Sequence, residues 1–340
     1  TQHVAPQPSV ACASWCIDNK QPWSLKCARF KSCGGCAQCS LLPGVASNSH
    51  ASLLVQRNSG AASLLDNCWH VYVDVGSNIG VQTRKLFEPS KYWTRDENSS
   101  LQETHRIFTR YFGEQATRRA HCCAVGFEPN PHHHQRLKLI EETYNSLGWR
   151  TSFLPLAASV RSGTSIFHYD TSKTGRSHHE WGASLVATDY NQKNGLNSNG
   201  NKSHQAGHFG RRTKVGVVDL AQWLGSQVLA RRLPTLPSKP TLGTPSLVMK
   251  VDVEGAELDL LPRLVHMRVL CHFAHVMVEF HPGAYPTHVN PMQFMQVFLA
   301  NASAACPETV VSTLDDETYN KDGVPLPSRA TAHAIHGGGR

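Results

Sequence analysis

Ionisable side chains follow directly after short apolar runs at several points of the chain, and the clearest case is VMKVDVEGAE at residues 248–257. On a strand, Lys250, Asp252 and Glu254 would share one face, because side chains alternate with a period of two. Such groups are costly to bury unless they pair with one another or take part in chemistry. The segment therefore predicts either a reaction centre or a lysine–carboxylate network that only fixes the turn.

A glycine-rich turn follows an earlier apolar run, VYVDVGSNIG at residues 71–80. A turn of this kind between a strand and a helix lets the backbone approach a ligand closely. Gly76 and Gly80 are spaced G-x3-G, whereas nicotinamide-binding proteins use G-x-G-x-x-G. The spacing favours a nucleoside ligand without a pyrophosphate and disfavours a dehydrogenase. A junction in which glycine only relieves backbone strain is the alternative.

Glu128 ends the second apolar run, in GFEPNP at residues 126–131. An acid at the tip of the second strand is where a ribose diol is held, because a carboxylate accepts two hydroxyl hydrogen bonds. The separation from the first turn exceeds the usual ~20 residues, and a polar insertion at residues 88–119 accounts for the excess. A charge at a helix N-terminus is the alternative interpretation of Glu128. A last run, VEFHP at residues 278–282, brings one more acid and His281 to the same edge.

Strands and helices must alternate along the chain to position these residues. Strands are expected at residues 71–75, 122–127, 150–156, 214–218, 247–253 and 275–280, with a hairpin within 163–190. Helices are expected at residues 80–87, 101–112, 131–147, 219–230, 256–265 and 291–301. This alternation predicts an α/β fold with a doubly wound, mostly parallel, Rossmann-like sheet. Such sheets bind ligands at the carboxyl ends of their strands.

Together these segments resemble the FkbM-type methyltransferases, which are S-adenosylmethionine-dependent enzymes. Residues 74–80, 127–131 and 250–257 follow the family's pattern in order, and so does WGASL at residues 181–185. The resemblance covers about residues 67–285. It implies a class I methyltransferase fold and O-methylation of a hydroxyl, often on a sugar or a secondary metabolite.

The same resemblance implies which residues would hold the cofactor, S-adenosyl-L-methionine. Its methionine end would lie against the first turn, and its ribose against the acid of the second strand. The implied contacts are Asp74, Gly76, Ser77, Asn78, Gly80 and Glu128. The third strand ends in Leu156-Ala157-Ala158, without the polar residue that many methyltransferases place against adenine.

Methyl transfer to oxygen needs a base, because a neutral hydroxyl is a poor nucleophile. The candidates are His281, Asp252 and Glu254, and imidazole has the ordinary pKa best suited to neutral pH. Lys250 would keep the carboxylates ionised or steer the acceptor oxygen. A divalent ion at Asp252 and Glu254 would need more oxygen ligands than are visible, so no metal site is predicted. The histidines at 132–134 and 178–179 are interpreted as exposed polar residues.

Six of the eleven cysteines lie between Cys12 and Cys39, in a segment with too few apolar residues to form a core. Disulfides or zinc would hold such a segment together. We favour disulfides, because six thiolates without an intervening histidine do not divide into four-ligand zinc sites. Cys122 and Cys123 lie in an apolar run and are interpreted as buried thiols.

The compartment expected from these cysteines is the secretory pathway lumen or the cell exterior, with the cytoplasm as the alternative. Glycosylation acceptors add weak support. They begin at Asn98, Asn201 and Asn301. The chain starts at Thr1, which we interpret as a trimmed product, and a membrane anchor is conceivable upstream of it.

The domain organisation follows from these patterns. We expect a Cys-rich segment at 1–40, a linker at 41–66, a methyltransferase domain at 67–310 with insertions at 88–119 and 191–212, and an extension at 311–340. The net charge of +8 is spread over the Cys-rich segment and the loops, so no nucleic-acid partner is predicted. The expected partner is a small-molecule or carbohydrate acceptor. The alternative function is a secreted or lumenal glycan-binding or scaffold protein on a non-catalytic methyltransferase-like fold.

Overall fold

The computed structural model describes residues 63–92, 100–169, 183–185, 212–235, 243–286, 288–314 and 325–328. The Cys-rich segment, nearly all of the linker and of the 191–212 insertion, and most of the C-terminal extension lie outside the described residues. The predicted boundaries of those parts therefore stay predictions. The structure concerns the α/β part of the chain.

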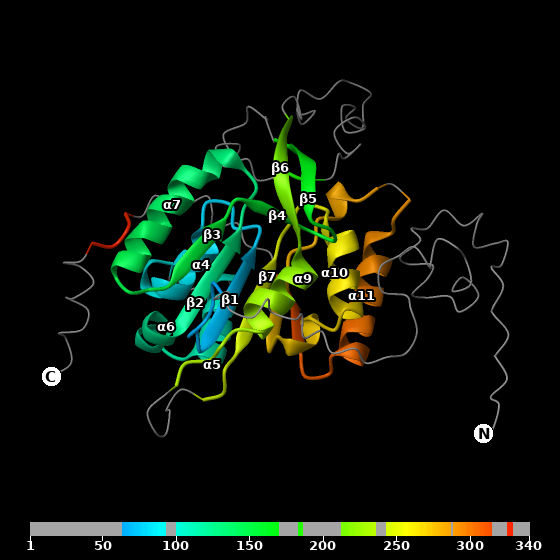
Figure 1. The fold of residues 1–340 in the computed structure, drawn as a ribbon. Helices are drawn as coiled ribbons and strands as arrows, with labels where there is room; N and C mark the ends of the chain where they lie inside the picture. The colour runs from blue at the N-terminus through cyan, green and yellow to red at the C-terminus, as the bar shows by residue number, and fades with distance from the viewer. Residues whose placement is uncertain are drawn as a thin grey trace, which may run out of the picture. The chain divides into compact units, whose positions relative to one another are not determined.

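A six-stranded parallel sheet forms the centre of this part, in the order β3-β2-β1-β7-β8-β9 (Figure 1). Its strands are β1 (His70–Val75), β2 (Cys122–Phe127), β3 (Thr151–Leu154), β7 (Leu247–Val251), β8 (His275–Val278) and β9 (Val310–Thr313). The register sets Val75 opposite both Phe127 and Val251, and Val251 opposite Val278. The strands that precede the candidate site residues therefore end at one level.

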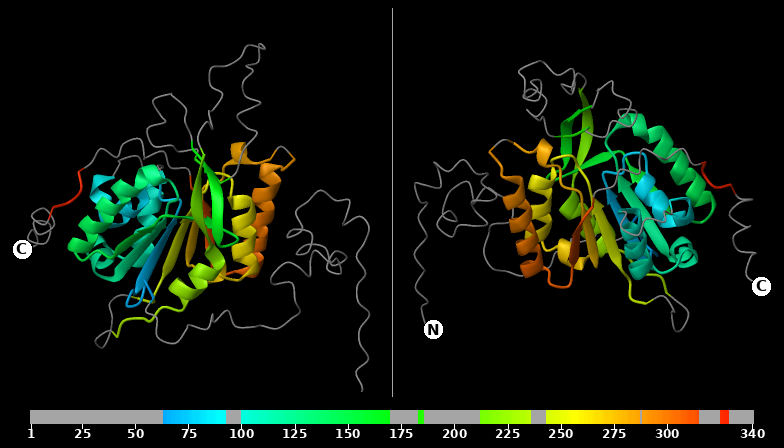
Figure 2. Two further views of the ribbon diagram at one scale, coloured as in Figure 1. Left: turned by 45° about the horizontal axis from the view of Figure 1, so that its top comes forward. Right: turned by 180° about the vertical axis from the view of Figure 1, so that it is seen from behind.

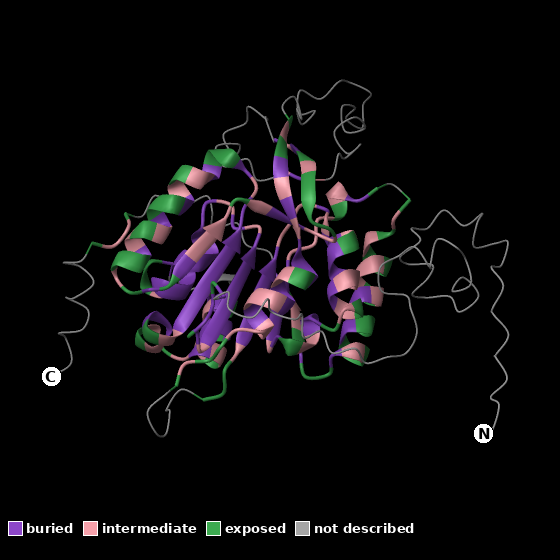
Figure 3. Cartoon of the chain, viewed as in Figure 1, coloured by how far each residue is buried: buried purple, intermediate pink, exposed green. Residues whose placement is uncertain are grey.

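Apolar runs make these strands suitable for a sheet that is covered on both faces. Every residue of β1, β2, β7 and β8 is buried (Figure 3). Such a strand holds an ionisable side chain only where that side chain finds partners. Asp74 in β1 and Lys250 in β7 are the two cases that matter for the site.

Helices cover both faces of the sheet, as the doubly wound prediction requires (Figure 2). One face packs against α4 (Val81–Phe87), α5 (Ser100–Phe112) and α7 (Pro131–Ser146), with α6 (Gln115–His121) beside α4. The other packs against α9 (Leu220–Trp223), the π-helical turn Leu224–Leu229, α10 (Glu257–His266) and α11 (Pro291–Ala305). Short 3-10 helices lie at Pro89–Lys91, Leu270–His272 and Pro282–Ala284. Among the described residues, no helix has the length and apolar content to cross a membrane.

A second, three-stranded sheet stands above the carboxyl edge of the first (Figure 1). It contains β4 (Leu156–Ser159), β5 (Gly163–His168) and β6 (Arg212–Asp219), in the order β4-β6-β5. β6 runs parallel to β4 and antiparallel to β5. Its apolar side chains form a small core of their own around Phe167, Val215 and Val217.

The second sheet corrects three predictions. The strand expected at 150–156 divides at Pro155 into β3 and β4, which belong to different sheets, because proline has no N–H to donate to a ladder. The strand expected at 214–218 lies in the small sheet. The described part of the hairpin at 163–190 is a single antiparallel bridge between His168 and Ser184, and β5 pairs instead with β6. Helix α6 and strand β9 were not predicted.

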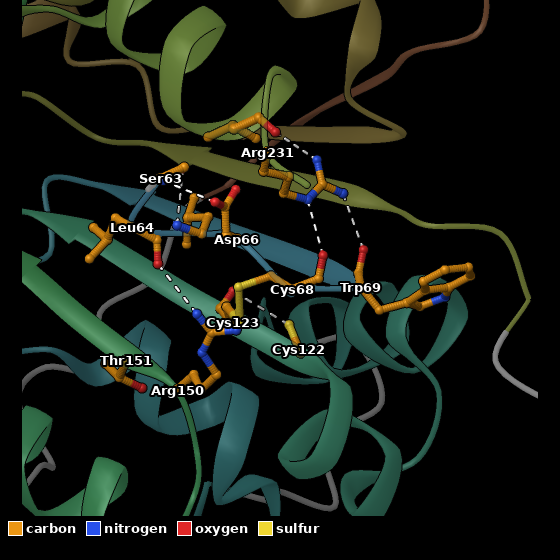
Figure 4. Close-up of a disulfide and its surroundings, with 12 residues drawn as sticks. Ser63, Leu64, Asp66, Cys68, Trp69, Cys122, Cys123, Arg150, Thr151 and Arg231 are labelled. Atoms are coloured by element: carbon orange, nitrogen blue, oxygen red, sulfur yellow. Dashed lines mark hydrogen bonds between the residues drawn. A yellow bond between two sulfur atoms is a disulfide. The ribbon is translucent and has the colours of Figure 1, made fainter. Parts of the chain in front are cut away.

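Two disulfides lie within the described residues: Cys68–Cys123 and Cys271–Cys306 (Figure 4 shows the first). The buried-thiol prediction is right for Cys122 and wrong for Cys123, because neighbouring residues of a strand point to opposite faces. Burial raises the pKa of the Cys122 thiol, so it is unreactive. Two disulfides indicate an oxidising compartment.

The cysteine pairing is directly testable. Digestion without reduction should release one peptide pair joined through Cys68 and Cys123 and another joined through Cys271 and Cys306. Cys122 should react with an alkylating agent only after denaturation, because its side chain is buried. Mass spectrometry of the peptides checks both expectations, and Cys122 in any disulfide would contradict the structure.

Candidate functional site

The turns after β1 and β7 approach each other closely at the point where the strand order reverses. Gly76 has φ +86, and a Cβ at this position would lie 1.7 Å from the carbonyl oxygen of Asp252. The Asp252 N–H also donates to the Val75 carbonyl at 2.9 Å. Only glycine fits at position 76, because any side chain would meet both an unfavourable φ and the Asp252 backbone. Ligands of doubly wound sheets bind at this reversal point.

Lys250 forms contacts with both of these turns. Its side chain is fully buried, and Nζ donates to the Gly76 carbonyl at 3.0 Å and lies 2.6 Å from Asp252 Oδ2. The sequence left open whether this lysine fixes the turn, and these contacts show that it does. The shared strand face predicted for Lys250, Asp252 and Glu254 is wrong, because β7 ends at Val251 and both acids lie in the following turn.

A cavity of about 210 Å³ lies at this edge of the sheet. Most of its polar side chains come from the turns after β1, β2, β7 and β8, with His133 from the first turn of α7 and Ser184 from the segment 183–185. Those from the turns are Asn78, Glu128, Asp252, Glu254, Glu279 and His281. The small sheet and the segment 183–185 supply most of its apolar wall, with Ala157, Ala158, Phe167, Ala183 and Leu185. A pocket with an apolar wall and a few convergent polar groups is the usual form of a small-molecule site.

Glu128 connects two of these turns. Its Oε2 accepts from the Asn78 N–H at 2.6 Å, and its Oε1 accepts from the Asn130 N–H at 2.9 Å. Asn130 in turn caps α7 by accepting from the His132 N–H, with Pro131 at the first helical position as expected. Since each carboxylate oxygen has a second lone pair, Glu128 can still accept ligand hydroxyls.

His281 is surrounded by carboxylates. Its Nδ1 lies 2.8 Å from Glu257 Oε1. Its Nε2 lies 3.4 Å from Asp252 Oδ1, 3.4 Å from Glu254 Oε1 and 3.7 Å from Glu279 Oε1. The fully buried Glu257 is itself held by the N–H groups of the turn after β7, at 3.2 and 2.9 Å.

This environment changes the protonation of the cluster. Burial alone would lower the pKa of His281, but the Glu257 hydrogen bond and the neighbouring carboxylates raise it to about 10. Burial raises the pKa of Glu254 to about 8, with Asp252 adding to the effect and the His281 charge opposing it. The ordinary imidazole pKa was the argument in favour of His281 among the three candidate bases, and that argument does not hold here.

The predicted site residues divide into two groups. Gly76, Asn78, Glu128, Asp252, Glu254 and His281 line the cavity. The others are buried and are not among its lining residues: Asp74, Ser77, Gly80 and Lys250. Asp74 accepts from Tyr72 Oη at 3.4 Å and from Thr83 Oγ1 at 3.3 Å. The second bond joins β1 to α4 across the first turn, so Asp74 supports that turn without lining the cavity.

Several lining residues were not assigned from the sequence. Glu279 was expected at this edge of the sheet but was given no role. The interpretation of His133 as an exposed residue is wrong, because His133 is buried and lines the cavity. Within the apolar wall, residues 183–185 and Ala157-Ala158 had been noted in the sequence, but Phe167 carried no signal because it reaches the cavity through the small sheet. Ser184, in the described part of the WGASL segment, donates from Oγ to the Glu254 carbonyl at 2.6 Å.

Searches against protein-family models, curated proteins and solved structures find no match to this chain. The α/β fold and its parallel sheet are therefore established by the structure alone. The resemblance to FkbM-type methyltransferases rests on the sequence motifs. The strand order does not select a cofactor, because doubly wound proteins with different nucleotide ligands share it.

Replacing Gly76 with alanine tests the close approach of the two turns. Gly148 is a matched control, since its φ is +81 and nothing lies within 4 Å of an added Cβ. Gly148→Ala should lower the free energy of unfolding by about 1–2 kcal/mol, the cost of the left-handed backbone alone. Gly76→Ala should cost at least about 2 kcal/mol more, because the Asp252 carbonyl must move. Urea unfolding measures both, and equal losses would contradict the geometry.

The buried Asp74 should make stability depend on pH. Burial raises its pKa to about 6, opposed by Lys250 and reinforced by Asp252. A carboxyl group whose pKa is raised by folding destabilises the protein as the pH rises through that value. The gain in free energy of unfolding from Asp74→Asn should therefore be about 1 kcal/mol larger at pH 8 than at pH 5. Urea unfolding at both pH values measures this gain, and a gain that does not change with pH would show that burial leaves Asp74 unperturbed.

Proposed function

We propose that the chain is an S-adenosylmethionine-dependent methyltransferase that O-methylates a hydroxyl of a carbohydrate or another small metabolite. One observation carries the proposal. The four segments that resemble FkbM-type methyltransferases are far apart in the sequence, yet residues from all four line a single cavity at the reversal point of the sheet. Parallel pairing aligns the strand ends that carry three of these segments, whereas residues 183–185 lie outside the main sheet and line the same cavity.

The residues present fit this cofactor in chemical type. Glu128 has lone pairs left for the two ribose hydroxyls, and Gly76 and Asn78 offer a close backbone approach for the methionine end. Ala157 and Ala158 give an apolar surface suited to the adenine face. The bound cofactor would supply an electrophilic methyl group. Cofactor and acceptor together would extend beyond the cavity, whose 210 Å³ is less than the ~300 Å³ at the lower end of small-molecule pockets.

The carboxylate cluster supports a neutral hydroxyl acceptor. Carboxylates accept hydrogen bonds from hydroxyl groups and repel anions, so sugars fit this part of the cavity better than phosphates or sulfates do. Asp252 is held by Lys250 through Oδ2. Glu254 lines the cavity with its Oε1 3.4 Å from His281 Nε2, on a left-handed backbone with φ +51. We assign Glu254 as the residue that takes the acceptor's proton, because its position leaves the carboxylate directed at the cavity.

The non-catalytic alternative makes a different prediction. A scaffold or glycan-binding protein on the same fold would not bind the cofactor. The cluster around His281 weighs against that alternative, since Asp252, Glu254 and Glu279 surround a single imidazole and leave negative charge at the cavity that a bound ligand would offset. Binding of a nicotinamide cofactor would point to an oxidoreductase instead.

Calorimetric titration with S-adenosylmethionine and S-adenosylhomocysteine tests the proposal. The wild-type chain should bind both, and Glu128→Gln should weaken binding at least about tenfold, the effect of losing one charge-assisted contact. Glu142→Gln, which removes an exposed carboxylate from α7, should bind as the wild type does. Thermal unfolding of each variant checks that the fold is kept. Absence of wild-type binding at millimolar cofactor would refute the proposal.

Transfer of a labelled methyl group to a panel of neutral and sulfated sugars identifies the acceptor class. Neutral sugars should be labelled in preference to sulfated ones, because the carboxylates repel anions. Glu254→Gln should lower the rate by about 10²-fold or more while cofactor affinity stays the same. Preferential labelling of sulfated sugars would contradict the proposed role of the cluster.

A further inference from the structure

We propose that Asp252, Glu279 and His281 form a binding site for a divalent transition-metal ion where the turns after β7 and β8 line the cavity. One ligand atom from each residue lies within 4.8 Å of the other two. The sequence suggested no such site, because Asp252 and Glu254 alone offered too few ligands. The two residues that complete it come from the neighbouring strand end.

The spacing of the atoms is that of a coordination shell. His281 Nε2 lies 3.4 Å from Asp252 Oδ1 and 3.7 Å from Glu279 Oε1, which is too long for a good hydrogen bond. Metal–ligand bonds of about 2.0–2.2 Å place two ligands of one ion roughly 3–4 Å apart. The separations of the three atoms are therefore those of ligands that share one ion.

His281 is oriented as a metal ligand would be. Its Nδ1 is paired with Glu257 Oε1 at 2.8 Å, and this leaves Nε2 directed at the two carboxylates. Metal-ligating histidines almost always hydrogen-bond a carboxylate or a carbonyl through their other nitrogen. Glu257 is fixed by the Val253 and Gly255 N–H groups, so the ring is positioned before any ion arrives. Glu257 is thus a positioning residue and not a ligand.

Asp252 is also oriented as a metal ligand would be. Lys250 holds its Oδ2 at 2.6 Å, and its Oδ1 is the oxygen that faces His281. Glu254 Oε1, also 3.4 Å from Nε2, is within reach as a fourth ligand. Since these residues all line the cavity, an ion here would keep coordination positions open to water or to a hydroxyl.

The donor set selects the kind of ion. Imidazole suits zinc, iron, copper and nickel, whereas carboxylates suit magnesium, calcium and manganese. One imidazole with two or three carboxylates favours manganese, iron or zinc over calcium. The ligand geometry of this site does not depend on whether the chain transfers methyl groups.

Mn²⁺ titration followed by electron paramagnetic resonance tests the site on the full chain. The wild type should bind one ion more per chain than Asp252→Asn/Glu279→Gln/His281→Gln, which keeps the shapes of the two acids and removes all three ligands. Each single substitution should weaken that ion at least about tenfold. Glu142→Gln should change nothing. Equal numbers of ions bound by the wild type and the triple variant would overturn the proposal.

A second measurement covers the case in which the triple variant does not fold. The Mn²⁺ bound most tightly by the wild type should show coupling to one directly coordinated imidazole nitrogen in pulsed resonance spectra, and His281→Gln alone should remove it. A wild-type spectrum without that nitrogen would overturn the site. Cofactor titration is a separate readout, so loss of Mn²⁺ binding and loss of S-adenosylhomocysteine binding are distinguishable outcomes.

Discussion

The contact between the turns after β1 and β7 is the constraint on which the rest of the structure depends. Gly76 lacks a side chain where the Asp252 carbonyl lies, and the buried Lys250 bonds to both turns. This contact fixes where the backbone of the first turn runs and where the carboxylate of Asp252 points. The crossovers then leave toward opposite faces of the sheet, and the cavity lies at the edge between them.

Two carboxylate systems meet at this cavity, and they differ in how the protein satisfies them. Glu128 accepts from two backbone N–H groups and needs no countercharge. The cluster around His281 has four acids near one imidazole, with Lys250 bonded to Asp252, so negative charge remains. The first system suits neutral ligand hydroxyls and the second suits a cation or a proton donor. The same fold therefore offers a region suited to neutral hydroxyls next to a more negatively charged region.

The sequence predicted those features of the site that depend only on residues close together in the chain. The G-x3-G turn, the acid before Asn130-Pro131 and the lysine–carboxylate segment each lie at one strand–turn–helix junction, where turn and cap residues mark the boundary. Parallel pairing then aligns the strand ends, so the convergence of Gly76, Glu128 and Asp252 followed from the fold class. The role of Lys250 as a tie between turns was one of two outcomes that its spacing allowed.

Contacts between distant segments could not be predicted in this way. Strand β5 finds its partner β6 across more than 40 residues, and the disulfide partners are 55 and 35 residues apart, with no local pattern to mark them. The pairing of β7 with β8 decides that Glu279 and His281 face Asp252. The pKa of His281 depends on the same long-range arrangement, so the ordinary imidazole pKa could not indicate whether His281 is suited to act as the base.

Hydrogen exchange with S-adenosylhomocysteine bound tests whether the cavity at the β1–β7 reversal is a cofactor site. We expect slower exchange of the backbone amides at residues 76–80 and 128–133, with little change around Gly148, just beyond the far end of α7. Unchanged exchange at both turns, or protection confined to other segments, would contradict the proposed cofactor site.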